Sequence, residues 1–397
     1  MIEIIDKSQC CGCTACASIC PQKAISMVQD EEGFLYPIID KTKCINCGLC
    51  DKVCPVKNAR KETFKQDAYI VNNKDEIIRS DSTSGGAFTP IAEYVLNRNG
   101  VVFGATFDDE YNVIHTYVED LEEIKRFRGS KYVQSYLGDT FKTVKKFLDS
   151  GKMVCFSGTP CQIEGLKAYL QKDYENLVTV DVMCHAVPSP LVWKKYLKYE
   201  ISKLKGTQIE KILFRDKDKY GYKYSTMTIK TNIDEYSKGI ESDPYLRAFF
   251  GDLSDRPSCY DCKFKKQCHI SDFTIWDCFI VDNFDKSLDD DKGTSRILVN
   301  TENGRRIFEE IKDNFKCTEV EVEAIVENVR EMLHSVKINP DRNVFFKELN
   351  ELDEKQFFES WFPDSIKVKI ERVFRVTMAK IGIYKLVKKY LKKLLGK

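Results

Sequence analysis

The chain has 397 residues, of which 43% are hydrophobic and 31% charged, so it is long enough for two or three ordinary globular domains. No apolar run approaches the ~18 residues that a membrane-spanning helix needs, and we expect no transmembrane segment. Seventeen cysteines, with no recognisable leader peptide, favour a reducing compartment and metal ligation over disulfide bonds.

The chain opens with two cysteine runs of the form C-x2-C-x2-C-x3-C-P, which end at Pro21 and Pro55. Matched cysteines are 34 residues apart and Ile-Ile-Asp-Lys precedes both runs, so the segment is an internal repeat. Bacterial ferredoxins bind two 4Fe–4S clusters with this spacing, and the fourth cysteine of each run ligates the other cluster. Zinc ribbons usually show two C-x2-C pairs, which makes zinc the weaker alternative. We expect one cluster on Cys10, Cys13, Cys16 and Cys54, and the second on Cys44, Cys47, Cys50 and Cys20.

Residues 1–60 should therefore form a dicluster ferredoxin-like domain with short strands near 2–5, 24–28 and 34–39. Cys11 fits no ligand position in the repeat and is interpreted as a bystander. A charged linker follows at 57–66.

In the next part of the chain, predicted strands alternate with predicted helices. We predict strands at 68–71, 101–105, 113–118, 153–156 and 177–182, and helices at 87–98, 140–149 and 162–170. Strand–helix–strand order predicts parallel βαβ units. The fold class is thus α/β, or α+β overall, with domains at 66–150 and 151–350. Beyond residue 208 the sequence mixes short strands and helices, and their order along the chain is harder to predict.

Two predicted strands lead directly into cysteine-bearing turns, at Cys161 and at Cys184. These thiols should lie at one edge of the sheet, where α/β proteins place ligands. Cys259 and Cys262 add a further C-x2-C pair, so a third 4Fe–4S cluster is one interpretation, and buried free thiols are the other. Cys268 is close enough in sequence to compete as a ligand. Histidine is scarce, with four in the chain, and we interpret His185 as a neighbour of the ligands and not a catalyst.

Four further stretches resemble a known family: 82–88 (STSGGAF), 128–135 (RGSKYVQS), 157–162 (SGTPCQ) and 184–190 (CHAVPSP). Together with 259–262 and 291–295 they are similar, in the same order over roughly residues 1–310, to the coenzyme F420 hydrogenase/dehydrogenase beta-subunit family. The similarity is to bacterial members with an N-terminal dicluster domain. By itself, the 82–86 turn could be a phosphate cradle or only a helix cap.

The resemblance implies a flavin-binding α/β domain in which FAD exchanges hydride with an organic molecule. It implies that FAD is held by Ser84, Gly85, Gly86, Lys131, Tyr132 and Gln134. It also implies a third cluster on Cys161, Cys184, Cys259 and Cys262. Ala186 and Trp276 stand where family members usually have glycine, and the tryptophan is expected to narrow the space near the flavin or substrate.

Residues 366–397 carry nine lysines and two arginines against one glutamate, a net charge of +10 that leaves −9 on the rest of the chain. Within 364–397, apolar residues from 383 to 395 fall on one half of a helix and lysines on the other. This basic amphipathic helix either contacts an anionic membrane or packs on the body. The asymmetry favours a docking segment over nucleic-acid binding.

We therefore expect an iron–sulfur flavoprotein oxidoreductase that passes electrons from a ferredoxin-like donor or partner subunit, through 4Fe–4S clusters and FAD, to an organic substrate. The alternative is a non-catalytic electron-transfer subunit of a larger complex. The expected location is cytoplasmic, on the inner face of the membrane if the basic helix binds there.

Overall fold

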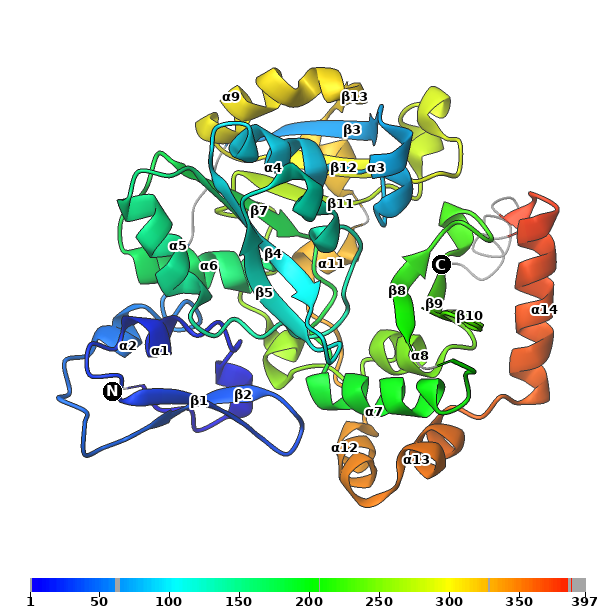
Figure 1. Cartoon of the computed structure of the whole chain (residues 1–397), viewed down its shortest axis with the longest axis horizontal. Coiled ribbons are helices and arrows are strands. Elements are labelled where there is room, and N and C mark those ends of the chain that lie inside the picture. Colours follow the sequence, from blue (N-terminus) through cyan, green and yellow to red (C-terminus); the bar gives the residue numbers. More distant parts are fainter. Residues whose placement is uncertain (1, 61–64, 207, 328, 385–386, 388–397) are drawn as a thin grey trace.

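The computed structural model describes residues 2–60, 65–206, 208–327, 329–384 and 387 (Figure 1). The N-terminal module holds an antiparallel pair, β1 (Ile25–Gln29) with β2 (Leu35–Ile39), and two short helices, α1 (Ala15–Ile19) and α2 (Leu49–Lys52). The predicted strands near 24–28 and 34–39 are confirmed. The strand predicted at 2–5 is wrong, because the backbone N–H of Ile2 donates to Cys50 Sγ, 3.2 Å away, and the segment pairs with no described strand.

One large mixed sheet forms the body. Its strand order is β13-β3-β12-β11-β7-β6-β4-β5, with parallel pairing through β11, β7, β6 and β4 and antiparallel pairing elsewhere. The strands are β3 (Asp67–Asn73), β4 (Val101–Phe107), β5 (Val113–Val118), β6 (Val154–Gly158), β7 (Leu177–Val182), β11 (Phe273–Asp277), β12 (Ser295–Val299) and β13 (Phe315–Val320). Both predicted sequence ranges, 66–150 and 151–350, thus contribute strands to the same sheet.

Helices cover both faces of this sheet, which is why its central strands read as continuous apolar runs. On one face α4 (Phe88–Leu96) and α9 (Glu302–Ile311) pack on side chains that include Val102 and Cys155. On the other, α5 (Thr140–Asp149) and α6 (Pro160–Leu170) pack on Val101, Val154 and Phe156. The mixed α/β architecture confirms the predicted fold class, and Cys155 is a core residue with no exposed surface.

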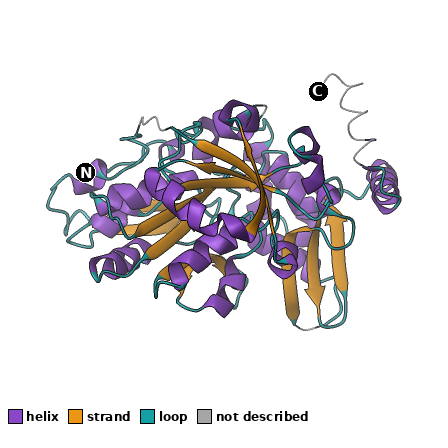
Figure 2. Ribbon diagram, turned by 90° about the horizontal axis from the view of Figure 1, so that it is seen from above, coloured by secondary structure: helices purple, strands orange, loops and turns teal. Residues whose placement is uncertain are grey.

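A smaller antiparallel sheet, β10-β9-β8, lies beside the body, and Figure 2 shows its three strands apart from the large sheet. Aromatic side chains join it to the helices around it and to Phe34 and Tyr36 of the N-terminal module. The elements are β8 (Ile209–Asp216), β9 (Thr226–Thr231), β10 (Glu235–Gly239), α7 (Pro190–Ile201), α8 (Pro244–Phe250), α12 (Arg342–Glu351) and α13 (Glu354–Trp361). Short helices complete the described chain at α3 (Glu76–Asp81), α10 (Val322–Val326) and α11 (Arg330–Leu333), with 3-10 turns η1 (Lys7–Gln9), η2 (Leu121–Phe127), η3 (Tyr222–Tyr224), η4 (Pro257–Asp261), η5 (Val281–Asn283), η6 (Lys286–Leu288) and η7 (Lys312–Asn314).

Two buried arginines attach the N-terminal module to the body. Arg256 donates from Nε to the carbonyl of Cys10 at 2.7 Å and from Nη2 to that of Leu35 at 2.9 Å, and its guanidinium lies over the Tyr36 ring. Arg342, on α12, forms a bidentate ion pair with Glu32 at 2.8 and 2.6 Å. The cysteine module is therefore fixed against the segment that follows α8 and against α12.

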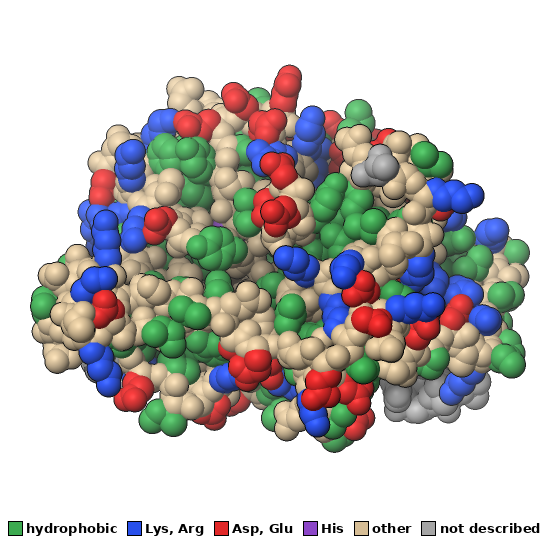
Figure 3. Space-filling view, turned by 60° about the horizontal axis from the view of Figure 1, so that its bottom comes forward, with side chains coloured by type: hydrophobic (Ala, Val, Ile, Leu, Met, Phe, Trp, Pro, Cys, Tyr) green, Lys and Arg blue, Asp and Glu red, His purple; other side chains and the backbone are tan. Residues whose placement is uncertain are grey.

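The last described helix, α14 (Ile366–Lys380), stands at the edge of the molecule and buries none of its side chains (Figures 1 and 2). Most of the predicted amphipathic pattern, at 385–386 and 388–397, lies outside the described residues. Among the described helices none is both long and apolar enough to cross a membrane. On the face in Figure 3, acidic and basic side chains are interspersed.

Candidate iron–sulfur and flavin sites

The N-terminal cysteines gather in two groups. Cys20, Cys44, Cys47 and Cys50 line one pocket at the start of α2, and they come from both runs. Left-handed backbone at Thr14 and Gly48, with φ of 64° and 75°, begins the turns that wrap α1 and α2 around the thiols. The N–H of Ala24 donates to Cys20 Sγ at 3.3 Å, in the way that backbone amides stabilise a thiolate.

The other group contains Cys10, Cys13, Cys16 and Cys54. Burial, together with the neighbouring Cys10 and Cys54 thiols, raises the pKa of Cys16 to about 12. A thiol with a pKa this high stays protonated at neutral pH unless a metal displaces the proton, so iron binding at Cys16 releases a proton. The structure thus places the cysteines in two groups, and four soft sulfur donors per group suit a 4Fe–4S cluster.

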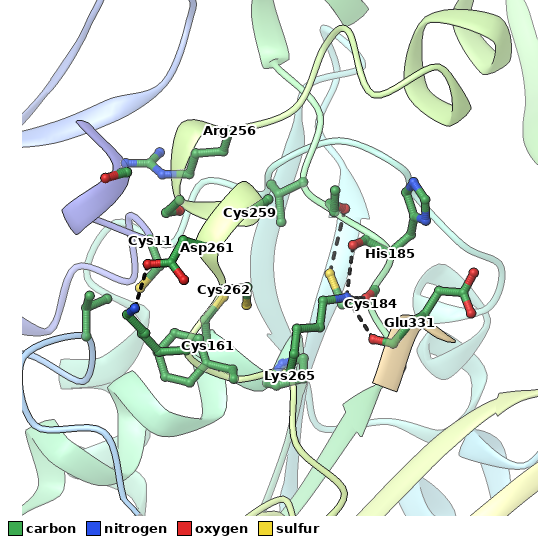
Figure 4. A pocket seen from close by; sticks show the side chains of 18 of the residues that line it. Cys11, Cys161, Cys184, His185, Arg256, Cys259, Asp261, Cys262, Lys265 and Glu331 are labelled. Atoms are coloured by element: carbon green, nitrogen blue, oxygen red, sulfur yellow. Dashed lines mark hydrogen bonds and ion pairs between the residues drawn. The ribbon is translucent and has the colours of Figure 1, made fainter. Parts of the chain in front are cut away.

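A third set of thiols meets at the edge of the large sheet. Cys161 lies in the first turn of α6, Cys184 follows β7, and Cys259 and Cys262 lie in and just after η4 (Figure 4). Because β6 and β7 pair in parallel, their carboxyl ends bring the first two together. Burial raises the pKa of Cys184 to about 12. All four line one pocket, and they are the donor set that a further 4Fe–4S cluster needs.

Backbone and lysine contacts fix this loop cluster. Thr159 and Gln162 form a capping box that starts α6 next to Cys161. Lys265 Nζ donates to the carbonyls of Cys184, His185 and Glu331, the last two at 3.0 and 2.8 Å (Figure 4).

Sequence reasoning missed the place of Cys11. Its side chain lines the same pocket, within hydrogen-bonding reach of both Cys13 and Cys161. The contact with Cys13, together with burial, raises its pKa. Cys11 therefore lies between the N-terminal cysteines and the third set, a position that the spacing of the repeat does not reveal.

The remaining cysteines lie elsewhere. Cys268 contacts the side chain of Gln66, with 3.9 Å between Sγ and Oε1, and it does not line the pocket. Cys278 is fully buried in a separate apolar cluster, and Cys317 lies half-buried on β13.

The six residues that resemblance assigns to FAD lie in two places. Gln134 is at the junction of module and body, where it donates to the carbonyl of Cys11 and accepts from Arg256. Ser84 and Tyr132 lie near the small sheet instead. Lys131 Nζ donates to three backbone carbonyls, and burial lowers its pKa to about 7.

The two glycines have structural reasons of their own. A Cβ on Gly85 would come within 2.5 Å of Ser295 N and Val71 O, and Gly86 has a left-handed φ of 78°. Both are therefore required where the chain passes over β3 and β12.

A polar chain connects Ser84 with Tyr132 through residues that sequence reasoning did not single out. Ser84 Oγ lies 3.4 Å from Tyr222 Oη, Tyr222 donates to Asp277 at 2.8 Å, and Asp277 pairs with Arg215 at 2.8 Å. Arg215 lies beside Tyr132, and its buried Nη2 has no hydrogen-bond partner among the described residues.

An unpaired guanidinium N–H next to an aromatic ring suits an anionic or electron-rich ligand, so these residues could hold such a group. Trp276 packs with Arg296 and Phe284 in a different cluster. The narrowing near the flavin or substrate that the sequence predicts for this tryptophan stays a prediction.

Cysteine sets of this kind on a doubly covered α/β body define an iron–sulfur electron-transfer protein. Comparison with known families agrees. Residues 68–141 match the N-terminal part, and 151–325 the C-terminal part, of the coenzyme F420 hydrogenase/dehydrogenase beta subunit, and 9–58 match a 4Fe-4S dicluster domain. The chain belongs to the coenzyme F420 hydrogenase/dehydrogenase beta-subunit family, which confirms the resemblance seen in its motifs.

One similar solved structure is from the F420-reducing NiFe hydrogenase complex of Methanosarcina barkeri. It shares 14% identity over 75% of this chain and 91% of that chain, with a TM-score of 0.44. A search of curated proteins found no match.

Proposed function

We propose that this protein is an iron–sulfur flavoenzyme. Electrons from a ferredoxin-like donor or a partner subunit enter at the two N-terminal clusters, pass by the third cluster to FAD, and reach an organic substrate. Bound FAD supplies the conversion between single electrons and the electron pair of a hydride.

The contact between Cys13 and α6 is the observation that carries this proposal. A Cβ on Gly165 would come within 2.8 Å of Cys13 Sγ, so this cysteine packs directly on α6, the helix that carries Cys161 in its first turn. Cys11 lies in the same gap. The N-terminal and third cysteine sets are thus contiguous, as a path for single electrons requires.

For the flavin, the proposal assigns Ser84, Lys131 and Tyr132 to the binding region and adds Arg215. The guanidinium pairs with Asp277 and lies beside Tyr132, and an electron-rich or anionic group of the flavin would accept a hydrogen bond from its Nη2. Gly85 and Gly86 keep the turn below them close to the sheet. Gln134 instead orients the junction between the cysteine sets.

Anaerobic reduction of the holoprotein by a ferredoxin-type donor tests the path. In the wild type we expect the N-terminal clusters and the flavin to be reduced together. In Cys184→Ser the flavin should be reduced at least about tenfold more slowly, because one ligand of the intermediate site is gone. Cys317→Ser, a half-buried thiol on β13, is the matched control. Equal flavin reduction in both variants would contradict the proposal.

The carrier-subunit alternative predicts a different outcome. Without a partner, a carrier would hold clusters but turn over no acceptor. Measured turnover of any organic acceptor by the isolated chain, with FAD bound, excludes it.

We also propose that the C-terminal helix contacts an anionic membrane from the cytoplasmic side. In α14, Ile366, Ile370 and Val373 are 77%, 65% and 64% exposed, and Lys367 and Lys369 lie among them. An apolar stripe with basic neighbours is the pattern of an interfacial helix. Anionic vesicles should sediment the full chain and not a chain ending at residue 365; equal pelleting would reject the contact.

A further inference from the structure

An unpartnered buried carboxylate lies next to the third set of cysteines. The side chain of Asp255 is 0% exposed, and neither of its carboxylate oxygens has a hydrogen-bond partner among the described residues. Cys184 and Cys259 are both close enough to interact electrostatically with it. Burying a carboxylate without a partner is costly, and anionic iron–sulfur ligation beside it would increase that cost.

The nearest cations do not compensate Asp255 directly. Lys265 Nζ is shared among three backbone carbonyls, and the Arg342 guanidinium makes its bidentate pair with Glu32. Arg342 reaches only the backbone carbonyl of Asp255, at 2.8 Å. Neither cationic side chain therefore pairs with the Asp255 carboxylate.

Two other metal-ligating groups lie next to Asp255. Ligand atoms of His185, Asp252 and Asp255 all lie within 4.8 Å of one another. His185 Nε2 contacts Asp252 Oδ1 at 3.0 Å, and the rings of Phe249 and Phe250 hold the imidazole in place. The His185 and Asp252 side chains are 24% and 23% exposed, so the site opens to solvent on one side.

We propose that His185, Asp252 and Asp255 bind a divalent cation beside the third set of cysteines. Two carboxylates and one imidazole supply mixed oxygen and nitrogen donors and a charge of −2, which one divalent ion balances. This donor set suits Mn²⁺, Fe²⁺ or Zn²⁺ better than soft thiophilic ions, and water can complete the coordination on the open side. The ion fixes the loop after Cys184 and offsets negative charge next to the candidate cluster ligands. Binding of this ion does not depend on the flavin.

Titration of the anaerobic, cluster-loaded protein with Mn²⁺ tests the site, with free Mn²⁺ followed by its solution EPR signal. We expect about one ion per chain at sub-millimolar affinity. Asp255→Asn should weaken binding at least about tenfold, because it removes one of two ligand charges. Asp252→Asn, at a partly exposed position, should weaken Mn²⁺ binding to a similar extent. This second variant shows that the loss of binding does not come from a folding defect caused by changing the buried Asp255.

The matched control is Asp261→Asn, in the same loop, whose side chain is 77% exposed and pairs with Lys263; it should bind Mn²⁺ like the wild type. No binding up to about 1 mM, or wild-type affinity in both Asp255→Asn and Asp252→Asn, overturns the proposal. Iron and flavin content, measured in the same samples, report on the electron path separately.

Discussion

Replacing Arg256 with methionine should loosen the cysteine module from the body. The side chain is 1% exposed and makes three hydrogen bonds of 2.7 to 2.9 Å, to the carbonyls of Cys10 and Leu35 and to Gln134. Hydrogen bonds to a charged group contribute about 1.5–3 kcal/mol each, but removing the buried charge also relieves its desolvation. Methionine retains the apolar contact with Tyr36. We therefore expect the free energy of unfolding to fall by about 3 kcal/mol.

Anaerobic urea titration, followed by cluster absorbance, measures this loss. The matched control is Arg126→Met, since the Arg126 side chain is 44% exposed and pairs only with Glu123 among the described residues, at 3.1 Å. This control should change the free energy of unfolding by less than about 0.5 kcal/mol. The same Arg256 variant should transfer electrons from donor to flavin more slowly, because the two cysteine sets are no longer held together. If Arg256→Met and Arg126→Met prove equally stable, this arginine does not hold the module.

Three further substitutions test the sites. Gly165→Ala would place a Cβ 2.7 Å from the Cβ of Cys13, so it should lower the free energy of unfolding by about 1–3 kcal/mol and reduce the bound iron. Unchanged iron content and stability would show that α6 and the N-terminal module do not touch. Cys184→Ser should remove about four irons per chain and leave about eight, as counted by colorimetric iron assay, whereas an unaltered count would remove Cys184 from the ligands. Arg215→Met should lower the FAD retained through purification, and full FAD occupancy in this variant would place the flavin elsewhere.

The sequence could reveal what local spacing encodes. The cysteine repeat predicts the crossed grouping of eight thiols, and apolar runs such as 153–156 and 177–182 predict the parallel strands that bring Cys161 and Cys184 together. Contacts between distant segments could not be seen in this way. Arg256 and Cys10 are 246 positions apart, and Arg215 and Asp277 are 62 apart.

The strand predicted at 2–5 shows a second limit. Apolar Ile2 is buried as a strand residue would be, but its N–H is used by a cysteine sulfur and not by a neighbouring strand. Hydrophobic pattern reports burial, whereas the hydrogen-bond partner depends on the fold around it.

Quantifying iron, acid-labile sulfide and flavin in anaerobically purified protein tests the central claim most directly. Three 4Fe–4S clusters and one flavin predict about twelve irons, about twelve sulfides and about one FAD per chain. Colourless protein, or zinc in place of iron, would contradict the iron–sulfur assignment, and iron without flavin would contradict the flavoenzyme.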